Sequence, residues 1–490
     1  MSAPPATPSP AVVVNPRTGR PAGPLEGAIL LACACMSVLA AVLMAPNLPR
    51  IQEAFAGTPG VEALAPMVVT VPALMVGLTA LIAGRVVDRV GRKRLLVGAL
   101  VLYAVAGTAP LWLPTLPLIV ASRVLVGLCE AVIMTACTTL LADYFHGAQR
   151  VRYFGYQVMT TTIAATVLFG LGGALGASSW RVPFGLYAVG LVLAVLCAVF
   201  LFNTTHVPEG DEALPPVRWS LLLAPVAVSF LGGLVFYVLI VQLSYRLVEV
   251  GVTSPPMIGL VSAIASVGTA AGSFTFTRIA GRGHAFTVPL AFVLSGLGLL
   301  GMGLAPSVAL LVPAAVVTGF GNGLLLPSLL TWTLTPLTHG QHGRGTGLWT
   351  SASFLGNFVC PILVLVLAGA FGGLGVAIVA VGVLSLVVGV AVRLGRGSRR
   401  PHRGRGGRGA WRRPLRQAGR HTVGRLGSSA GPLGPAAQPE NTDQQISSRR
   451  AWSSRTSCRT CGGSWSRCQS RSARAASGSC GSAARIALMA

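Results

Sequence analysis

Long apolar runs recur along this chain, and they constrain its fold more than any other feature. We place twelve such cores, each about twenty residues long, which is enough to cross a bilayer as a helix. Only 10% of the residues are charged, whereas a soluble domain has about 25%. Strands of a membrane barrel would alternate polar and apolar residues, but 376–392 is apolar apart from Ser385. The sequence therefore predicts an all-α membrane protein with twelve transmembrane helices. The expected spans lie near 27–47, 65–85, 95–113, 117–141, 157–177, 183–203, 220–244, 257–279, 286–305, 308–333, 346–368 and 372–393.

Basic residues are distributed unequally between the two sets of loops. With the N-terminus in the cytoplasm, thirteen basic residues of the body face the cytoplasm. Only Arg50, Arg181 and Arg246 then face outward. This asymmetry follows the positive-inside rule and predicts that both termini are cytoplasmic.

Composition divides the chain into five segments. We expect a cytoplasmic N-terminal tail at 1–26, a six-helix bundle at 27–203, a cytoplasmic linker at 204–219 and a second six-helix bundle at 220–393. The remainder, 394–490, is rich in Arg, Ser and Gly and predicts a disordered tail. Its texture is that of a GC-rich gene read in a shifted frame, which is our first interpretation.

The tail also explains the high net charge of +25. Residues 393–490 contain twenty arginines and two acids, so most of the excess lies outside the spans. Arginine clusters can bind phosphates of RNA or lipid headgroups, and Cys458 and Cys461 have the spacing of a zinc half-site. Both readings stay open as alternatives, but we expect no nucleic-acid partner and no bound metal.

A charged turn with two glycines, 84–94, separates the second and third spans. Its glycines, acid and basic residues resemble the loop signature of the major facilitator superfamily of secondary transporters. The resemblance covers about residues 27–393 and is closest to bacterial twelve-helix drug and metabolite exporters. It implies two six-helix bundles that rock around a central cavity, with alternating access to the two sides of the membrane.

The same resemblance implies a gate at this loop. Asp88 would face the N-terminus of the eleventh helix, expected near 345–349, where the helix dipole favours an anion. Arg92 would pair with Asp143 at the end of the fourth helix. The alternative for Asp88 is a solvated acid among basic neighbours. The residues assigned to gating are Gly84, Asp88, Arg89, Gly91, Arg92 and Asp143.

Two charged residues lie inside the fourth span and are candidates for proton coupling. Arg123 is costly in hydrocarbon and resembles the fourth-helix arginine of proton-coupled exporters of the family. Glu130 is an acid near the middle of a span, which makes it a plausible proton carrier. The two lie on one helix face about 10 Å apart along the axis, too far for a direct ion pair. Alternatives are an interfacial arginine and a glutamate that bonds a neighbouring helix.

Further polar residues within spans are candidates for lining the substrate cavity. Each could equally form a hydrogen bond between helices. The glycines at 170–173 predict close packing of the fifth span against a neighbour. The cavity candidates are Gln157, Tyr237, Gln242, Asn322 and Asn357.

Signals for enzyme chemistry are missing from the sequence. It has no phosphate-cradling Gly-x-x-x-x-Gly-Lys motif and no metal-ligand spacing among its loop histidines. We predict a transporter rather than an enzyme, with no cofactor, acting as a monomer in the bacterial inner (plasma) membrane. Proton-driven efflux of small amphiphilic compounds by an antiporter is the first choice. Alternatives are proton-coupled uptake of a small metabolite or organic anion attracted by Arg123, and a non-transporting membrane protein with a nucleic-acid-binding tail.

Overall fold

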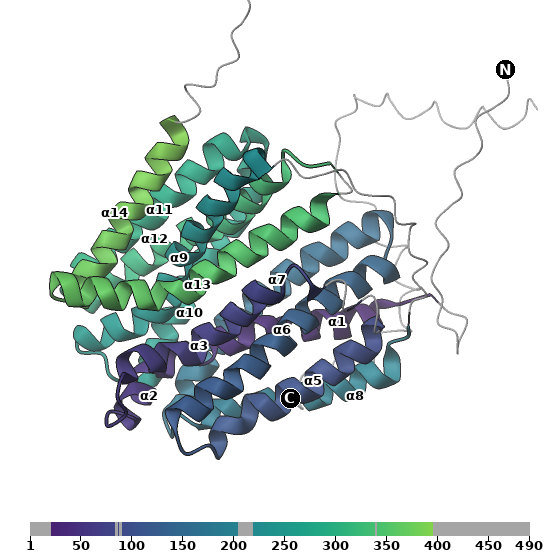
Figure 1. Cartoon of the computed structure of the whole chain (residues 1–490), viewed down its shortest axis with the longest axis horizontal. Coiled ribbons are helices and arrows are strands. Elements are labelled where there is room, and N and C mark those ends of the chain that lie inside the picture. The colour runs from purple at the N-terminus through teal and green to yellow at the C-terminus, as the bar shows by residue number, and fades with distance from the viewer. Residues whose placement is uncertain (1–20, 84–86, 88–90, 204–218, 339–340, 395–490) are drawn as a thin grey trace, which may run out of the picture. The chain divides into compact units, whose positions relative to one another are not determined.

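Long helices joined by short turns make up the described part of the chain. The computed structural model describes residues 21–83, 87, 91–203, 219–338 and 341–394. Within these ranges, 12 helices are long and apolar enough to cross a membrane. The predicted number of spans and the all-α class are therefore confirmed (Figure 1).

The first half of the chain supplies six of these spans. Its elements are α1 (Pro24–Val42), η1 (Ala45–Asn47), α2 (Leu48–Ala54), α3 (Val61–Thr79), α5 (Arg92–Thr108), η2 (Ala109–Leu111), α6 (Leu116–Tyr144), α7 (Gly147–Gly176), η3 (Val182–Ala188) and α8 (Val189–Phe200). The second half supplies the other six. Its elements are α9 (Trp219–Glu249), α10 (Pro255–Ile279), η4 (Ala280–Arg282), α11 (His284–Leu304), α12 (Val308–Leu334), α13 (His342–Phe371) and α14 (Leu374–Leu394).

Several helices extend beyond the apolar cores that predicted them. The fifth span was expected from residue 157, whereas α7 begins ten residues earlier, at Gly147. The added turns contain Gln149, Arg150 and Arg152, which are exposed. Apolarity marks only the part of a helix that lies in hydrocarbon, and the backbone continues to hydrogen-bond as a helix beyond it.

The helices form two bundles of six. In the first, α6 packs against α3 and α5, while α1 packs against α7 and α5 against α8. In the second, α11 packs between α12 and α14, while α9 packs against α13. The two bundles meet along two seams, α7 against α10 and α3 against α13 (Figure 1). These seams place a central space between the bundles.

Glycines allow the close approach of α7 and α10 at one seam. A Cβ atom built on Gly173 would lie 2.8 Å from the Cα of Gly259 and would clash with the carbonyl oxygen of Pro255. No other residue type fits this distance without moving a backbone. The close packing predicted for the glycines of the fifth span is therefore present.

The two ends of the bundles are distinguished by the residues that they carry. The motif side has Gly91 and His146, and the opposite side has Gly60 and Ser254. The sequence predicts that the motif side is cytoplasmic. The predicted linker and C-terminal tail lie outside the described residues except for Trp219 and Leu394, and so does most of the N-terminal tail.

Candidate functional site

A cavity of about 240 Å³ lies between the two bundles. Four helices of each bundle contribute to its wall: α1, α3, α6 and α7 from the first, and α9, α10, α12 and α13 from the second. The wall is mostly apolar and carries five aromatic rings. These belong to Phe169, Phe236, Tyr237, Trp349 and Phe354. Such a lining suits an apolar or weakly polar molecule.

Glu130 is the one charged side chain among the described residues that line this cavity. It lies on α6, is 6% exposed, and its Oε2 atom has no hydrogen-bond partner. A buried carboxyl oxygen is normally bonded, so an unpartnered one at a cavity wall is available to a proton or a ligand. The structure thus places the predicted acid on the wall of the central cavity.

Arg123 lies seven residues earlier on α6 and has a different environment. It is fully buried, and its Nη2 atom donates to the carbonyl oxygens of Ala106 at 2.9 Å and Gly107 at 3.1 Å. The guanidinium also lies over the rings of Phe184 and Tyr187, 5.2 and 5.3 Å from their centroids. Ala106 and Gly107 belong to the last turn of α5, where carbonyls lack helical partners and the dipole is negative. Arg123 therefore caps α5, and it is not among the residues that line the cavity.

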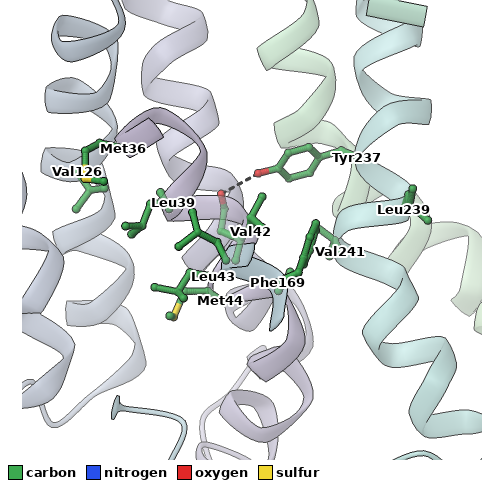
Figure 2. Packing of buried hydrophobic residues seen from close by; sticks show 14 of the residues in the cluster. Met36, Leu39, Val42, Leu43, Met44, Val126, Phe169, Tyr237, Leu239 and Val241 are labelled. Atoms are coloured by element: carbon green, nitrogen blue, oxygen red, sulfur yellow. Dashed lines mark hydrogen bonds between the residues drawn. The ribbon is translucent and has the colours of Figure 1, made fainter. Parts of the chain in front are cut away.

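Tyr237, Asn322 and Asn357 line the cavity. The Tyr237 hydroxyl donates to the carbonyl oxygen of Val69 on α3 at 3.2 Å, a bond between the two bundles. Figure 2 shows the Tyr237 ring reaching from α9 toward the buried apolar side chains around Val42 and Phe169. This hydrogen bond connects the two bundles at the cavity wall, where α9 approaches α3.

The two asparagines use their amides mainly to join helices. Asn322 donates to the carbonyl oxygen of Phe236 at 3.2 Å and accepts from the Ser295 hydroxyl at 3.0 Å. With its amide turned so that both ends are satisfied, Asn357 donates to the carbonyl oxygen of Gly233 at 2.9 Å. Each side chain therefore lies at the cavity wall while it holds the second bundle together.

Gln157 and Gln242 lie elsewhere. Gln157 donates to the Thr138 hydroxyl at 3.3 Å, so it joins α7 to α6. Gln242 is 5% exposed and lines a separate groove on the opposite side. Neither residue is part of the central wall.

Two further polar groups of the wall were missed by the sequence analysis. The Trp349 Nε1 and the Ser353 Oγ on α13 are both buried and unpartnered, and both residues line the cavity. A serine in a membrane helix usually bonds a carbonyl of its own helix, so sequence carries no signal that one faces a cavity. The buried and unpartnered polar groups of the described wall are therefore one carboxyl oxygen, one N–H donor and one hydroxyl, and Ser37, Ser262, Ser266 and Thr269 add further hydroxyls to the lining.

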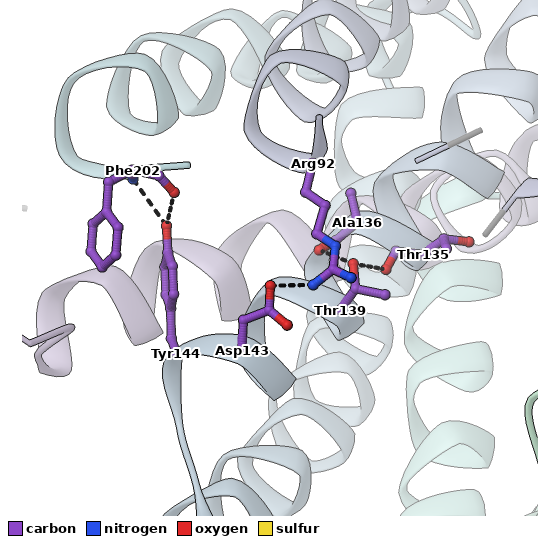
Figure 3. A network of polar contacts seen from close by, with 7 residues as sticks. All are labelled: Arg92, Thr135, Ala136, Thr139, Asp143, Tyr144 and Phe202. Atoms are coloured by element: carbon purple, nitrogen blue, oxygen red, sulfur yellow. Dashed lines mark hydrogen bonds and ion pairs between the residues drawn. The ribbon is translucent and has the colours of Figure 1, made fainter. Parts of the chain in front are cut away.

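An ion pair at the motif side joins α5 to α6, as expected. Arg92 Nη1 donates to Asp143 Oδ2, with 9% and 16% of the two side chains exposed (Figure 3). Next to it, the Tyr144 hydroxyl donates to the carbonyl oxygen of Phe202 at 2.6 Å. Lys93 donates to the carbonyl oxygen of Ala198 at 2.8 Å, at the end of α8. These contacts hold three helices of the first bundle together where the loop motif begins.

The rest of the predicted gate is described only in part. Gly84, Asp88 and Arg89 lie outside the described residues. Gly91 has a φ of +97°, a conformation that glycine adopts without strain. The eleventh span, α13, begins at His342, and a Cβ atom on its Gly347 would lie 3.2 Å from Leu81. The residues that follow α3 and the first turns of α13 are thus in contact.

No group of three or more His, Cys, Asp or Glu side chains that could hold a metal ion occurs in the described ranges. The unpartnered polar groups of the central cavity come from both bundles, Glu130 from the first and Trp349 and Ser353 from the second. The fold and the cavity define a multi-pass membrane transporter of small molecules. Residues 30–249 and 226–427 match the family model of the Major Facilitator Superfamily, and the chain belongs to that family.

The relatives of this chain include a transporter and several resistance proteins. The 3-(3-hydroxy-phenyl)propionate transporter of Escherichia coli K12 is 27% identical over 332 residues, which cover 64% of this chain and 80% of that protein. Multidrug resistance protein 1 of Bacillus subtilis is 27% identical over 299 residues, 58% of this chain and 75% of that protein. The quinolone resistance protein NorA of Staphylococcus aureus is 25% identical over 161 residues, 31% of this chain and 41% of that protein. These relatives are transporters and resistance proteins, not enzymes.

Solved structures share the fold. A bacterial homologue of the human lysosomal transporter Spinster, in an inward-facing and unoccupied conformation, matches with a TM-score of 0.59 and 17% identity. The match covers 77% of this chain and 96% of that one. A POT family transporter in complex with a thioalcohol-conjugated peptide matches with a TM-score of 0.62 and 12% identity, over 76% and 96% of the two chains. At these identities the likeness concerns the fold.

Proposed function

We propose that this protein exports small amphiphilic compounds in exchange for protons, by alternating access of the central cavity. The observation that carries the proposal is the position of Glu130, an unpartnered carboxyl group on the wall of an otherwise uncharged cavity. Membrane-embedded acids are costly and mark proton relays in transporters. An acid that takes up a proton on one side and releases it on the other can couple the proton gradient to the passage of a substrate.

The cavity wall supports an amphiphilic substrate. Its five aromatic rings and aliphatic side chains favour an apolar body, while Glu130, Trp349 and Ser353 offer a few directed polar contacts. Pockets for small molecules typically combine an apolar wall with a small number of polar groups. The resistance proteins among the relatives agree with export of such compounds.

Gating at the motif side is part of the same proposal. Arg92 and Asp143 would hold the ends of α5 and α6 in one arrangement while the bundles are closed on that side. Asp88, with Gly84, Arg89 and Gly91, would complete the latch against the start of α13. We further propose that the motif side is cytoplasmic, that both termini lie there, and that one chain is sufficient for transport in the bacterial inner membrane.

Uptake of an organic anion by proton symport is the second candidate. One observation favours it: the relative that transports 3-(3-hydroxy-phenyl)propionate is covered over 80% of its length. The anion was expected to be attracted by Arg123. In the structure that guanidinium is engaged with α5 and lies away from the cavity wall, which weakens this candidate.

Everted membrane vesicles test the direction and the coupling. With an inside-acid pH gradient, vesicles that contain the protein should accumulate ethidium or a quinolone, and nigericin should release it. Glu130→Gln should abolish the gradient-driven part, because the amide carries no transferable proton. The matched control is Glu26→Gln, which removes an acid that bonds the backbone of Gly23 at the start of α1. Full gradient-driven accumulation by Glu130→Gln would contradict the coupling role, and accumulation in right-side-out vesicles instead would favour uptake.

A further inference from the structure

A groove on the opposite side of the molecule is separate from the central cavity. It consists of two adjoining hollows of about 710 and 360 Å³, and Gln52, Glu62 and Tyr245 contribute to both. Its walls come from α2 and α3 of the first bundle and from α9 and α13 of the second. It is therefore the space between the bundles at that end.

A layer of side chains separates the groove from the cavity. On α3 the cavity wall begins at Val69, whereas the groove wall reaches Pro66. The hydrogen bond from Tyr237 to the carbonyl oxygen of Val69 joins α9 and α3 at this level (Figure 2). On α9 the two walls overlap in level: Leu243 lines the cavity, whereas its neighbour Gln242 faces the groove from another side of the helix. A molecule in the groove would thus not contact Glu130.

Carboxylates dominate the charge of the groove. Glu53, Glu62 and Glu249 line it, and no ion pair involving Glu53 or Glu62 is formed within the described ranges. Arg50 is the one basic residue on the described wall of either hollow, and both it and Arg246 are engaged. Arg50 donates to the carbonyl oxygens of Gly176 and Ala177 at the end of α7, and Arg246 pairs with Glu249. The groove is therefore suited to a cation and not to an anion.

A buried amide also points to a ligand in this groove. The Gln242 side chain is 5% exposed, lines the smaller hollow, and makes no hydrogen bond within the described part of the chain. The hydroxyl of Tyr245, one turn farther on α9, is also buried and unpartnered. Buried polar groups are bonded in most proteins, and leaving one unpaired destabilises the fold. The Tyr245 hydroxyl is such a group, and the Gln242 amide beside it lines the hollow without a partner in the described chain, so both are available to a bound molecule.

We propose that this groove is a second binding site, and that it takes the protonated amino group of a small organic cation. The ammonium N–H groups would donate to the Gln242 amide oxygen, the Tyr245 hydroxyl and the Glu62 carboxylate. Val364 and Leu365 of α13 would contact the organic part. A hydrogen bond from a charged donor is about twice as strong as a neutral one, which gives amines an advantage over alcohols of the same shape. The proposal does not depend on the direction of transport or on proton coupling.

Equilibrium binding of phenethylamine to the purified protein in nanodiscs at pH 7 tests the site. The measurement uses the Glu130→Gln variant, so that the central cavity offers no carboxylate. We expect saturable binding of phenethylamine and none of the neutral analogue 2-phenylethanol. Absence of saturable amine binding in this variant would overturn the proposal, whatever the outcome of transport assays.

Variants of the groove localise the bound amine. When Glu62→Gln is combined with Glu130→Gln, the affinity for phenethylamine should fall about tenfold, which corresponds to the loss of one charged hydrogen bond. Combining Glu26→Gln with Glu130→Gln should leave the affinity unchanged. Gln242→Glu should tighten binding, because it supplies a carboxylate at the same atom positions, so the test does not rest on loss of function alone. Equal weakening by Glu62→Gln and Glu26→Gln, or unchanged affinity in both Glu62→Gln and Gln242→Glu, would refute a site in the groove.

Discussion

Replacement of Arg123 by methionine should destabilise the first bundle without touching the cavity. The guanidinium makes two hydrogen bonds to carbonyls of α5 and lies over two aromatic rings. Hydrogen bonds of a charged donor contribute about 1.5–3 kcal/mol each, and each cation–π contact about 0.5–2 kcal/mol. Relief from burying the charge offsets several kcal/mol of this sum. We therefore expect the free energy of unfolding to fall by about 3 kcal/mol, chiefly because two buried carbonyls lose their partner.

Unfolding by SDS in mixed micelles measures this change, and transport by the folded fraction is measured in parallel. Arg123→Lys should lose about half as much stability, because one ammonium group cannot reach both carbonyls and stack on the rings. Arg181→Met is the matched control: it also removes donors to carbonyls, those of Pro110 and Leu113, but at a partly exposed site. Its cost should stay near 1 kcal/mol. Wild-type stability together with uncoupled proton transport in Arg123→Met would refute the capping argument and support the predicted role in coupling.

Two other variants test the gate and the seam. Asp143→Asn should lower the maximal transport rate several-fold, because the ion pair between Arg92 and Asp143 is lost. The double variant Arg92→Asp with Asp143→Arg should restore part of the rate in the same vesicle assay. Unchanged transport in Asp143→Asn would remove the pair from the gate. Gly173→Leu should abolish transport, since the side chain has no room against α10, whereas Gly170→Leu should be tolerated because nothing lies within 4 Å of a Cβ atom there. Equal activity of the two leucine variants in proteoliposomes would contradict the role of the close seam.

Most of what could be predicted from sequence came from two signals, the length of the apolar runs and the isolated charged residues within them. The twelve spans could be predicted because each contains a run of about twenty apolar residues, the length needed to cross a bilayer as a helix. Glu130 was a candidate for proton coupling because an acid in hydrocarbon is costly unless it faces a cavity or a partner. The pairing of Arg92 with Asp143 came from the family resemblance, and the ion pair is present.

Depth along a helix limited the rest of the prediction. Arg123 and Glu130 lie on one face of α6, about 10 Å apart along the helix axis. At the level of Glu130 this face lines the cavity, whereas at the level of Arg123 it contacts the end of α5. Gln242 shows a different limit: its neighbour Leu243 lines the cavity at the same level of α9, so Gln242 faces the groove from another side of that helix. Periodicity gives the direction of a side chain, and it does not give the level at which neighbouring helices leave a space. The cavity groups of Trp349 and Ser353 were missed for the same reason.

Basic side chains in the described part of the chain serve repeatedly to satisfy helix ends. Carbonyls in the last turn of a helix lack partners and carry a partial negative charge, so a nearby cation both bonds and neutralises them. The pairs are Arg50 with the end of α7, Lys93 with α8, Arg123 with α5 and Arg246 with α11. Four basic side chains are thus engaged with backbone carbonyls, whereas Glu130 faces the cavity and Glu62 the groove. Glu130 is the one charged side chain on the described wall of the cavity, and in the groove three carboxylates, those of Glu53, Glu62 and Glu249, outnumber the single lining arginine, Arg50. We therefore expect both places to bind an organic cation more readily than an anion.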